Sequence, residues 1–123
     1  MKSRDGLIRL KRFHVEEKRR QVSQIETMIA EFERMAKELD DQIRAEQQRS
    51  GIHDTAHFAY PTFAKAAIQR RDNLLASAGE LKQQLAGAKD EFDAAVEDLD
   101  KMQALADRDQ ASEAQEPRAA HGR

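Results

Sequence analysis

The side chains in this sequence whose spacing suits chemistry are the two histidines of His53-Asp54-Thr55-Ala56-His57. Two imidazoles at i and i+4 lie on one face of a helix, where they can hold a metal ion such as zinc. A zinc site needs further ligands, and Asp54 is the one other strong candidate nearby. Because short histidine motifs often match by accident, we expect polar loop residues here, with no bound metal and no other cofactor.

Other catalytic patterns are missing from the sequence. It has no glycine-rich phosphate loop and no nucleophile spaced with a base, and adjacent acids such as Asp40-Asp41 are typical of a solvated helix face. It also contains no cysteine, which excludes disulfide bonds and thiolate metal sites. We therefore expect a protein that works by contacting other molecules, and not an enzyme.

Small apolar residues recur every seven positions along two long stretches. The first stretch comprises Ile8, Val15, Val22, Ile29, Ala36 and Ile43, joined by Ile25, Phe32 and Leu39. The second comprises Ala64, Arg71, Ala78, Leu85, Phe92, Leu99 and Ala106, with Ala67, Leu74, Leu81, Ala88, Ala95 and Met102 between them. Alternating steps of three and four residues predict helices that pair with another helix along their length.

Composition supports long helices over a compact globule. Ala, Glu, Lys, Leu and Arg make up 62 of the 123 residues, and 36% of the residues are charged but only 5% are aromatic. Ser3 is a candidate N-cap, Gly51 a helix stop and Pro61 a helix start. We expect helices over 3–49 and 61–109, a bend over 50–61 and a flexible tail over 110–123. At 1.5 Å per residue each helix is roughly 70 Å long.

Charge and apolar spacing both favour an antiparallel pairing of these helices. Residues 1–20 carry eight Lys or Arg against three acids, whereas residues 90–116 carry ten acids against two bases. Folding the chain back at the bend pairs positions whose numbers sum to about 110, and this brings the basic start beside the acidic end. Lys11 and Lys18 occupy inward positions, from which their stems can reach acids such as Asp98 and Asp100. The predicted fold is an all-α, long two-helix antiparallel coiled-coil hairpin.

Two groups of residues are candidates for partner contact. Phe58, Tyr60 and Phe63 fall at the bend, where they either close the hairpin as a small plug or anchor a partner, and both roles are compatible. A second group lies off the inward positions near the start of the first helix; it comprises Leu7, Leu10 and Phe13 with Arg9 and Arg12. These apolar residues are either scattered surface residues or a basic, apolar end that docks into a groove or ring.

The beginning of the sequence lacks the apolar core of a secretory signal, and no apolar run is long enough to cross a bilayer. We therefore expect a soluble, cytoplasmic protein. A basic start followed by heptads also invites comparison with basic-zipper DNA binders. The heptads already begin at Ile8, however, and Glu16 and Glu17 interrupt the basic stretch, so we expect no specific nucleic-acid partner.

Three segments resemble the flagellar export protein FliJ, especially its alphaproteobacterial members. They are Ser3-Arg4-Asp5-Gly6-Leu7-Ile8-Arg9-Leu10-Lys11-Arg12-Phe13, Ile29-Ala30-Glu31-Phe32-Glu33-Arg34-Met35 and Gly51-Ile52-His53-Asp54-Thr55-Ala56-His57-Phe58-Ala59-Tyr60-Pro61-Thr62-Phe63-Ala64-Lys65-Ala66. The resemblance spans roughly residues 1–109 and rests on length, hairpin pattern and these segments together.

The resemblance implies a coupling role in type III protein export. Proteins of this family are antiparallel coiled coils, similar to the stalk subunit of rotary ATP synthases, and have chaperone-like roles. Their paired termini associate with the export ATPase ring and its regulator, and their bend side contacts the membrane export gate. Export substrates or their chaperones are further implied partners, and the implied location is the cytoplasmic base of the flagellum.

The resemblance also implies roles for particular residues. Tyr60 and Phe63 match a Tyr-x-x-Phe pattern whose Phe is implicated in gate contact, so Phe63 is the best carried-over site, with Phe58 and Tyr60 beside it. Leu7 and Leu10 match the family's apolar start loosely, and with Phe13, Arg9 and Arg12 they are the expected ring contacts. Two alternatives stay open, namely a generic coiled-coil scaffold and a substrate-holding chaperone without ATPase contact.

Overall fold

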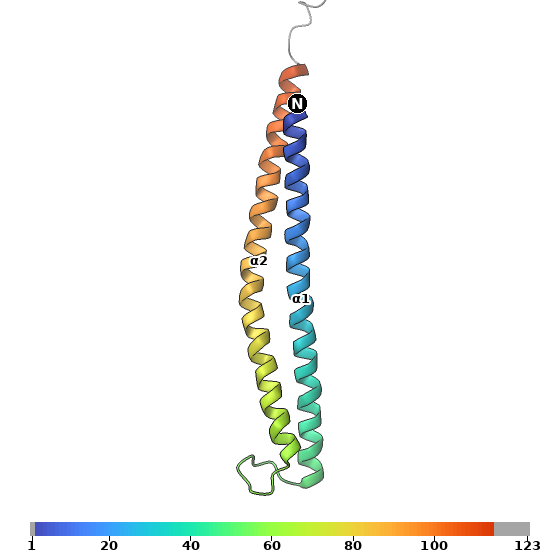
Figure 1. The fold of residues 1–123 in the computed structure, drawn as a ribbon, viewed down its shortest axis with the longest axis vertical. Coiled ribbons are helices and arrows are strands. Elements are labelled where there is room, and N and C mark those ends of the chain that lie inside the picture. Colours follow the sequence, from blue (N-terminus) through green and yellow to red (C-terminus); the bar gives the residue numbers. More distant parts are fainter. Residues whose placement is uncertain (1, 115–123) are drawn as a thin grey trace, which may run out of the picture. The chain divides into compact units, whose positions relative to one another are not determined.

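The computed structural model describes residues 2–114, and side chains from residue 4 onward. Two helices account for nearly all of this range, α1 over Lys2–Ser50 and α2 over Thr62–Ala114, and the described residues contain no strand (Figure 1). The helices pack against each other as an antiparallel hairpin, which confirms the predicted fold class. The chain divides into two compact units. We call residues 23–87 the turn unit, and residues 2–22 with 88–114 the terminal unit.

In the turn unit, the second half of α1 packs on the first half of α2 through small apolar side chains. The buried residues are Ile29, Ala36, Ile43, Tyr60, Ala64, Ala67, Ala78 and Leu81. All except Tyr60 occupy the predicted seven-residue repeats. Alanine dominates the α2 contribution, so the helices can approach closely while burying only a narrow apolar stripe.

In the terminal unit, the start of α1 packs on the second half of α2. The buried residues are Ile8, Val15, Ala88 and Ala95, again all at predicted inward positions. The ion pairs of this unit report its register directly, since Lys11 meets Asp98 and Lys18 meets Glu91, and each pair of residue numbers totals 109. The antiparallel register predicted from the sequence is therefore confirmed in this unit.

The helix ends differ from the predicted ones by a few residues. Helix α1 begins at Lys2, one residue before Ser3, and α2 begins at Thr62 because the Pro61 carbonyl accepts the first helical hydrogen bond, from the Lys65 amide at 3.1 Å. Helix α2 ends at Ala114 and not at 109, so the predicted tail is wrong for residues 110–114. No Gly or Pro interrupts that stretch, and Pro117 is the first residue that disfavours helix. The rest of the predicted tail, 115–123, lies outside the described residues.

The segment between the helices is built from short hydrogen-bonded turns. Gly51 ends α1 in the left-handed conformation, at φ 74°, and its amide donates to the Gln47 carbonyl at 2.9 Å. The Asp54 carboxylate then accepts the Ala56 amide at 2.9 Å, which forms an Asx turn. These local bonds set the path of the backbone that carries the three aromatic side chains of the bend.

Candidate functional site

The bend of the turn unit presents two of its three aromatic rings to solvent. Phe58 is 95% exposed and Phe63, in the first turn of α2, is 55% exposed. Exposed apolar patches on a folded protein often mark sites of contact with another molecule. Phe58 and Phe63 therefore form a candidate contact surface, which we call the turn surface.

Tyr60 has the opposite orientation and is buried. Its hydroxyl oxygen accepts a hydrogen bond from the Gln47 amide nitrogen at 3.0 Å, which ties the loop to the last turn of α1. Tyr60 is thus the plug of the hairpin, since its ring faces inward. Its contact with a partner stays a prediction. The sequence suggested two roles for these rings, closing the hairpin and contacting a partner. Tyr60 closes the hairpin, whereas Phe58 and Phe63 are exposed.

The position of the Phe58 ring depends on His57. The two rings stack with centroids 4.7 Å apart and an interplanar angle of 22°. Nδ1 of His57 accepts the Ala59 backbone amide at 3.0 Å, which holds the imidazole in place. This histidine therefore positions an exposed aromatic ring in the structure.

The terminal unit carries the second predicted group of contact residues, and all of them are exposed. Phe13 is 60% exposed, Leu7 and Leu10 are also open to solvent, and Arg9 and Arg12 lie among them. These five residues form the terminal surface. Its apolar groups surrounded by guanidinium groups suit an acidic partner groove that also has apolar pockets.

The two inward-facing lysines of α1 reach acids on α2. Lys11 Nζ lies 2.6 Å from Asp98, as predicted, and this contact lowers the pKa of Asp98 by hydrogen bonding and by charge attraction. Lys18 Nζ lies 3.1 Å from Glu91, so the prediction of Asp100 as an alternative acceptor is wrong. Glu91 lies seven residues, or two helical turns, before Asp98 on the same stripe of α2, whereas Asp100 lies off this stripe.

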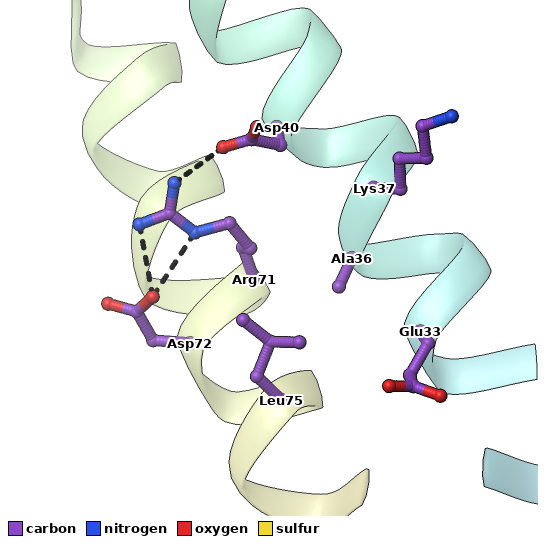
Figure 2. A pocket seen from close by; sticks show the side chains of 7 residues that line it. All are labelled: Glu33, Ala36, Lys37, Asp40, Arg71, Asp72 and Leu75. Carbon is purple, nitrogen blue, oxygen red and sulfur yellow. Dashed lines mark hydrogen bonds and ion pairs between the residues drawn. The ribbon is translucent and has the colours of Figure 1, made fainter. Parts of the chain in front are cut away.

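A shallow groove in the turn unit was not predicted from the sequence. It is lined by Glu33, Ala36, Lys37, Asp40, Arg71, Asp72 and Leu75 (Figure 2). At its centre the Arg71 guanidinium donates to Asp40 at 2.8 Å and to Asp72 at 3.1 Å, and the Asp40 hydrogen bond is the main cause of its raised pKa. The signal for the groove was a charged residue, Arg71, at an apolar position of the second repeat.

The ion pairs in this groove are better suited to fixing the pairing register of the two helices than to binding a ligand. Three guanidinium nitrogens of Arg71 donate hydrogen bonds to carboxylates of the same chain. Asp40 also pairs with Arg44 at 3.0 Å. A polar group at one inward position stabilises the register that satisfies it and disfavours shifted pairings. We therefore assign Arg71 to the hairpin and not to a binding site.

No group of three or more His, Asp or Glu side chains among the described residues is arranged to hold a metal ion. Neither described helix has an apolar stretch that meets the length and hydropathy needed to cross a membrane.

Three further large apolar side chains are exposed that the sequence reasoning did not single out. They are Met28, Leu75 and Leu105. The signal that could have found them is position, because each lies beside the inward-facing repeat and not in it.

Comparisons with protein-family models, with curated proteins and with solved structures found no match for this chain.

Proposed function

We propose that this protein is a non-enzymatic component of the flagellar type III export apparatus that couples the export ATPase to the export gate and assists export of flagellar subunits. The turn surface contacts the gate, and the terminal surface contacts the ATPase ring. The protein then works in the cytoplasm, held at the base of the flagellum by its partners.

The observation that carries the proposal is the exposure of Phe63. The resemblance to the FliJ family assigns gate contact to the Phe of the Tyr-x-x-Phe pattern, and an exposed ring is available for such a contact. Aromatic anchors that become buried on binding dominate the affinity of many interfaces. The buried Tyr60 fits the same scheme as the residue that holds the loop in place.

The chemistry of the two surfaces supports coupling. The terminal surface belongs to the first part of α1, and the turn surface follows the last residue of α1, Ser50. The basic terminal surface also differs in chemistry from the aromatic turn surface, as expected for two different partners.

A matched pair of substitutions tests the proposal. Phe63→Ala is expected to weaken binding to the purified cytosolic part of the gate protein by about tenfold or more, as for a typical hot-spot residue. Phe13→Ala is the matched control, since Phe13 is also a half-exposed helical phenylalanine. It should leave gate binding unchanged and weaken ATPase binding. Circular dichroism checks that both variants remain helical.

Two outcomes would contradict this scheme. Unchanged gate affinity in Phe63→Ala would show that the turn surface is not the gate contact. Tight binding of unassembled filament or hook subunits, with no binding of the ATPase, would favour a substrate-holding chaperone instead.

A further inference from the structure

One side of the terminal unit brings together residues from both helices that the proposed function does not use as a set. A hollow marks this side; it is lined by His14, Lys18, Glu91, Ala94, Ala95 and Asp98. Leu7 lies seven residues before His14, and Leu105 lies seven residues after Asp98. Because seven residues make two helical turns and the helices run antiparallel, both steps lead to the same level of the same side.

Leu7 and Leu105 therefore lie opposite each other across the hairpin. They are 45% and 41% exposed, and the more exposed Leu10 lies one turn from Leu7 on α1. Polar groups border this patch, namely the Lys11–Asp98 ion pair and the His14 imidazole beside Glu17. An apolar centre with a polar rim, contributed by two helices, has the composition of a protein interface. We call this patch, with the hollow beside it, the lateral face.

Charge is divided between the two helices of this unit. Residues 4–22 of α1 carry seven Lys or Arg against three acids, and residues 88–114 of α2 carry nine acids against three bases. On the lateral face itself the bases Lys11 and Lys18 come from α1, and the acids Glu91 and Asp98 come from α2. A surface that is basic along one helix and acidic along the other is complementary to a rotated copy of itself.

We propose that the lateral face binds a second copy of this chain, with α1 of each copy on α2 of the other. This arrangement requires a two-fold axis that runs parallel to the helices between the two copies. Leu7 and Leu105 of both copies then form one apolar cluster at the centre. The lysine and histidine side of each α1 faces the Glu91 and Asp98 side of the partner copy's α2.

The charges disfavour the other face-to-face pairing. Rotation about an axis perpendicular to the helices would place α1 on α1 and α2 on α2, so that the Lys11 and Lys18 side faces the same side of the other copy, and likewise the Glu91 and Asp98 side. Within the proposed pairing the acids keep capacity for a second donor, because Asp98 uses Oδ2 and Glu91 uses Oε2 for the lysine of its own copy.

The lateral face shares Leu7 and Leu10 with the terminal surface, but the test of the dimer involves neither the ATPase nor the gate. The apolar centre consists of a few half-exposed leucines, so we expect a weak, concentration-dependent dimer that dissociates further as salt screens the charges.

Sedimentation equilibrium of the full chain over a range of concentrations tests the proposal. At low salt the mass should rise from 14.0 kDa toward twice that value with increasing concentration. Leu7→Gln and Leu105→Gln should each raise the dissociation constant by about tenfold or more, since each change occurs twice in the dimer. Leu75→Gln is the matched control, because Leu75 is a 47% exposed helical leucine of the turn unit, and it should have no effect.

A monomer at every concentration would overturn the proposal, and so would a dimer that is weakened by Leu75→Gln but not by Leu7→Gln.

Disulfide trapping tests the orientation, since the chain contains no cysteine of its own. When Leu7→Cys and Leu105→Cys proteins are mixed and oxidised, mass spectrometry should find mostly the mixed species that joins position 7 to position 105. A predominance of 7–7 and 105–105 species would overturn the proposed pairing of α1 with α2.

Discussion

Gly79 and Gly87 lie inside α2, at positions where the fold does not use their lack of a side chain. A Cβ atom built on either residue meets no other atom within 4 Å, and neither glycine has a positive φ. Close helix approach, which would explain a glycine here, is therefore absent at both positions. Replacement by alanine should stabilise the protein, because glycine is a poor helix former and loses more backbone entropy on folding.

The expected size of this effect follows from helix propensity. Alanine is favoured over glycine by about 1 kcal/mol in a helix interior. The two sites are eight residues apart, or about 12 Å along the helix, so their effects should add to about 2 kcal/mol. For a domain of this size, about 1 kcal/mol raises the midpoint of thermal unfolding by about 4 °C, which predicts an increase of about 8 °C for the double variant.

Thermal and urea unfolding followed by circular dichroism at 222 nm, the helix band, measures this change. Gly51→Ala is the opposite control, because Gly51 has φ 74° and an alanine there is strained, so it should lower stability by about 1 kcal/mol. If Gly79→Ala and Gly87→Ala proved neutral or destabilising, the open surroundings described for these residues would be incorrect.

Two further predictions concern the loop plug and the inward-facing ion pair. Tyr60→Phe removes the hydroxyl that accepts the Gln47 amide hydrogen bond at 3.0 Å, and it should lower the free energy of unfolding in urea by about 1 kcal/mol. Phe58→Leu should change this free energy very little. Equal losses in the two variants would contradict the assignment of Tyr60 as the plug. The pKa of Asp98 is lowered by Lys11, so its contribution to stability is present at neutral pH and disappears as the pH falls through the lowered pKa, below the ordinary 3.8. Asp98→Asn should therefore be less stable than the parent chain at neutral pH and equally stable in strong acid, and a difference that persists in acid would refute this cause.

The spacing of small apolar residues was sufficient to predict the inward face of both helices. Val15, Ile29 and Ala95 are buried where the repeats place them, and Gly51 ends α1 as expected. Seven-residue spacing is reliable here because a two-helix hairpin has one inward stripe per helix. The basic and acidic ends identified the antiparallel register independently of the apolar pattern.

Orientation within the bend was beyond the reach of the sequence. Three aromatic residues within six positions have no repeat that assigns them to a face, and the Gln47 hydrogen bond decides that Tyr60 turns inward. The Asx turn at Asp54 and the His57 contact then leave Phe58 outside. Which ring faces inward therefore depends on the path of the loop backbone, which the residue types alone do not fix.

The sequence alone also did not determine which acid of α2 each inward-facing lysine of α1 contacts. Residues 88–114 of α2 contain nine acids, and the structure pairs Lys11 with Asp98 and Lys18 with Glu91. Leu105 was missed for a related reason, because it lies beside the repeat, and only the pairing of the two helices places Leu7 across from it. The ion-pair partners and the position of Leu105 opposite Leu7 thus depend on contacts between the helices, which the pattern of one helix does not contain.

A coupling role is best tested by the rate of ATP hydrolysis by the purified export ATPase of the encoding organism, measured with and without this chain. The full chain should bind the ATPase and raise the rate, Phe63→Ala should preserve this stimulation, and Phe13→Ala should reduce it. An unchanged rate with no binding at any concentration of the chain would contradict a coupling role in flagellar export.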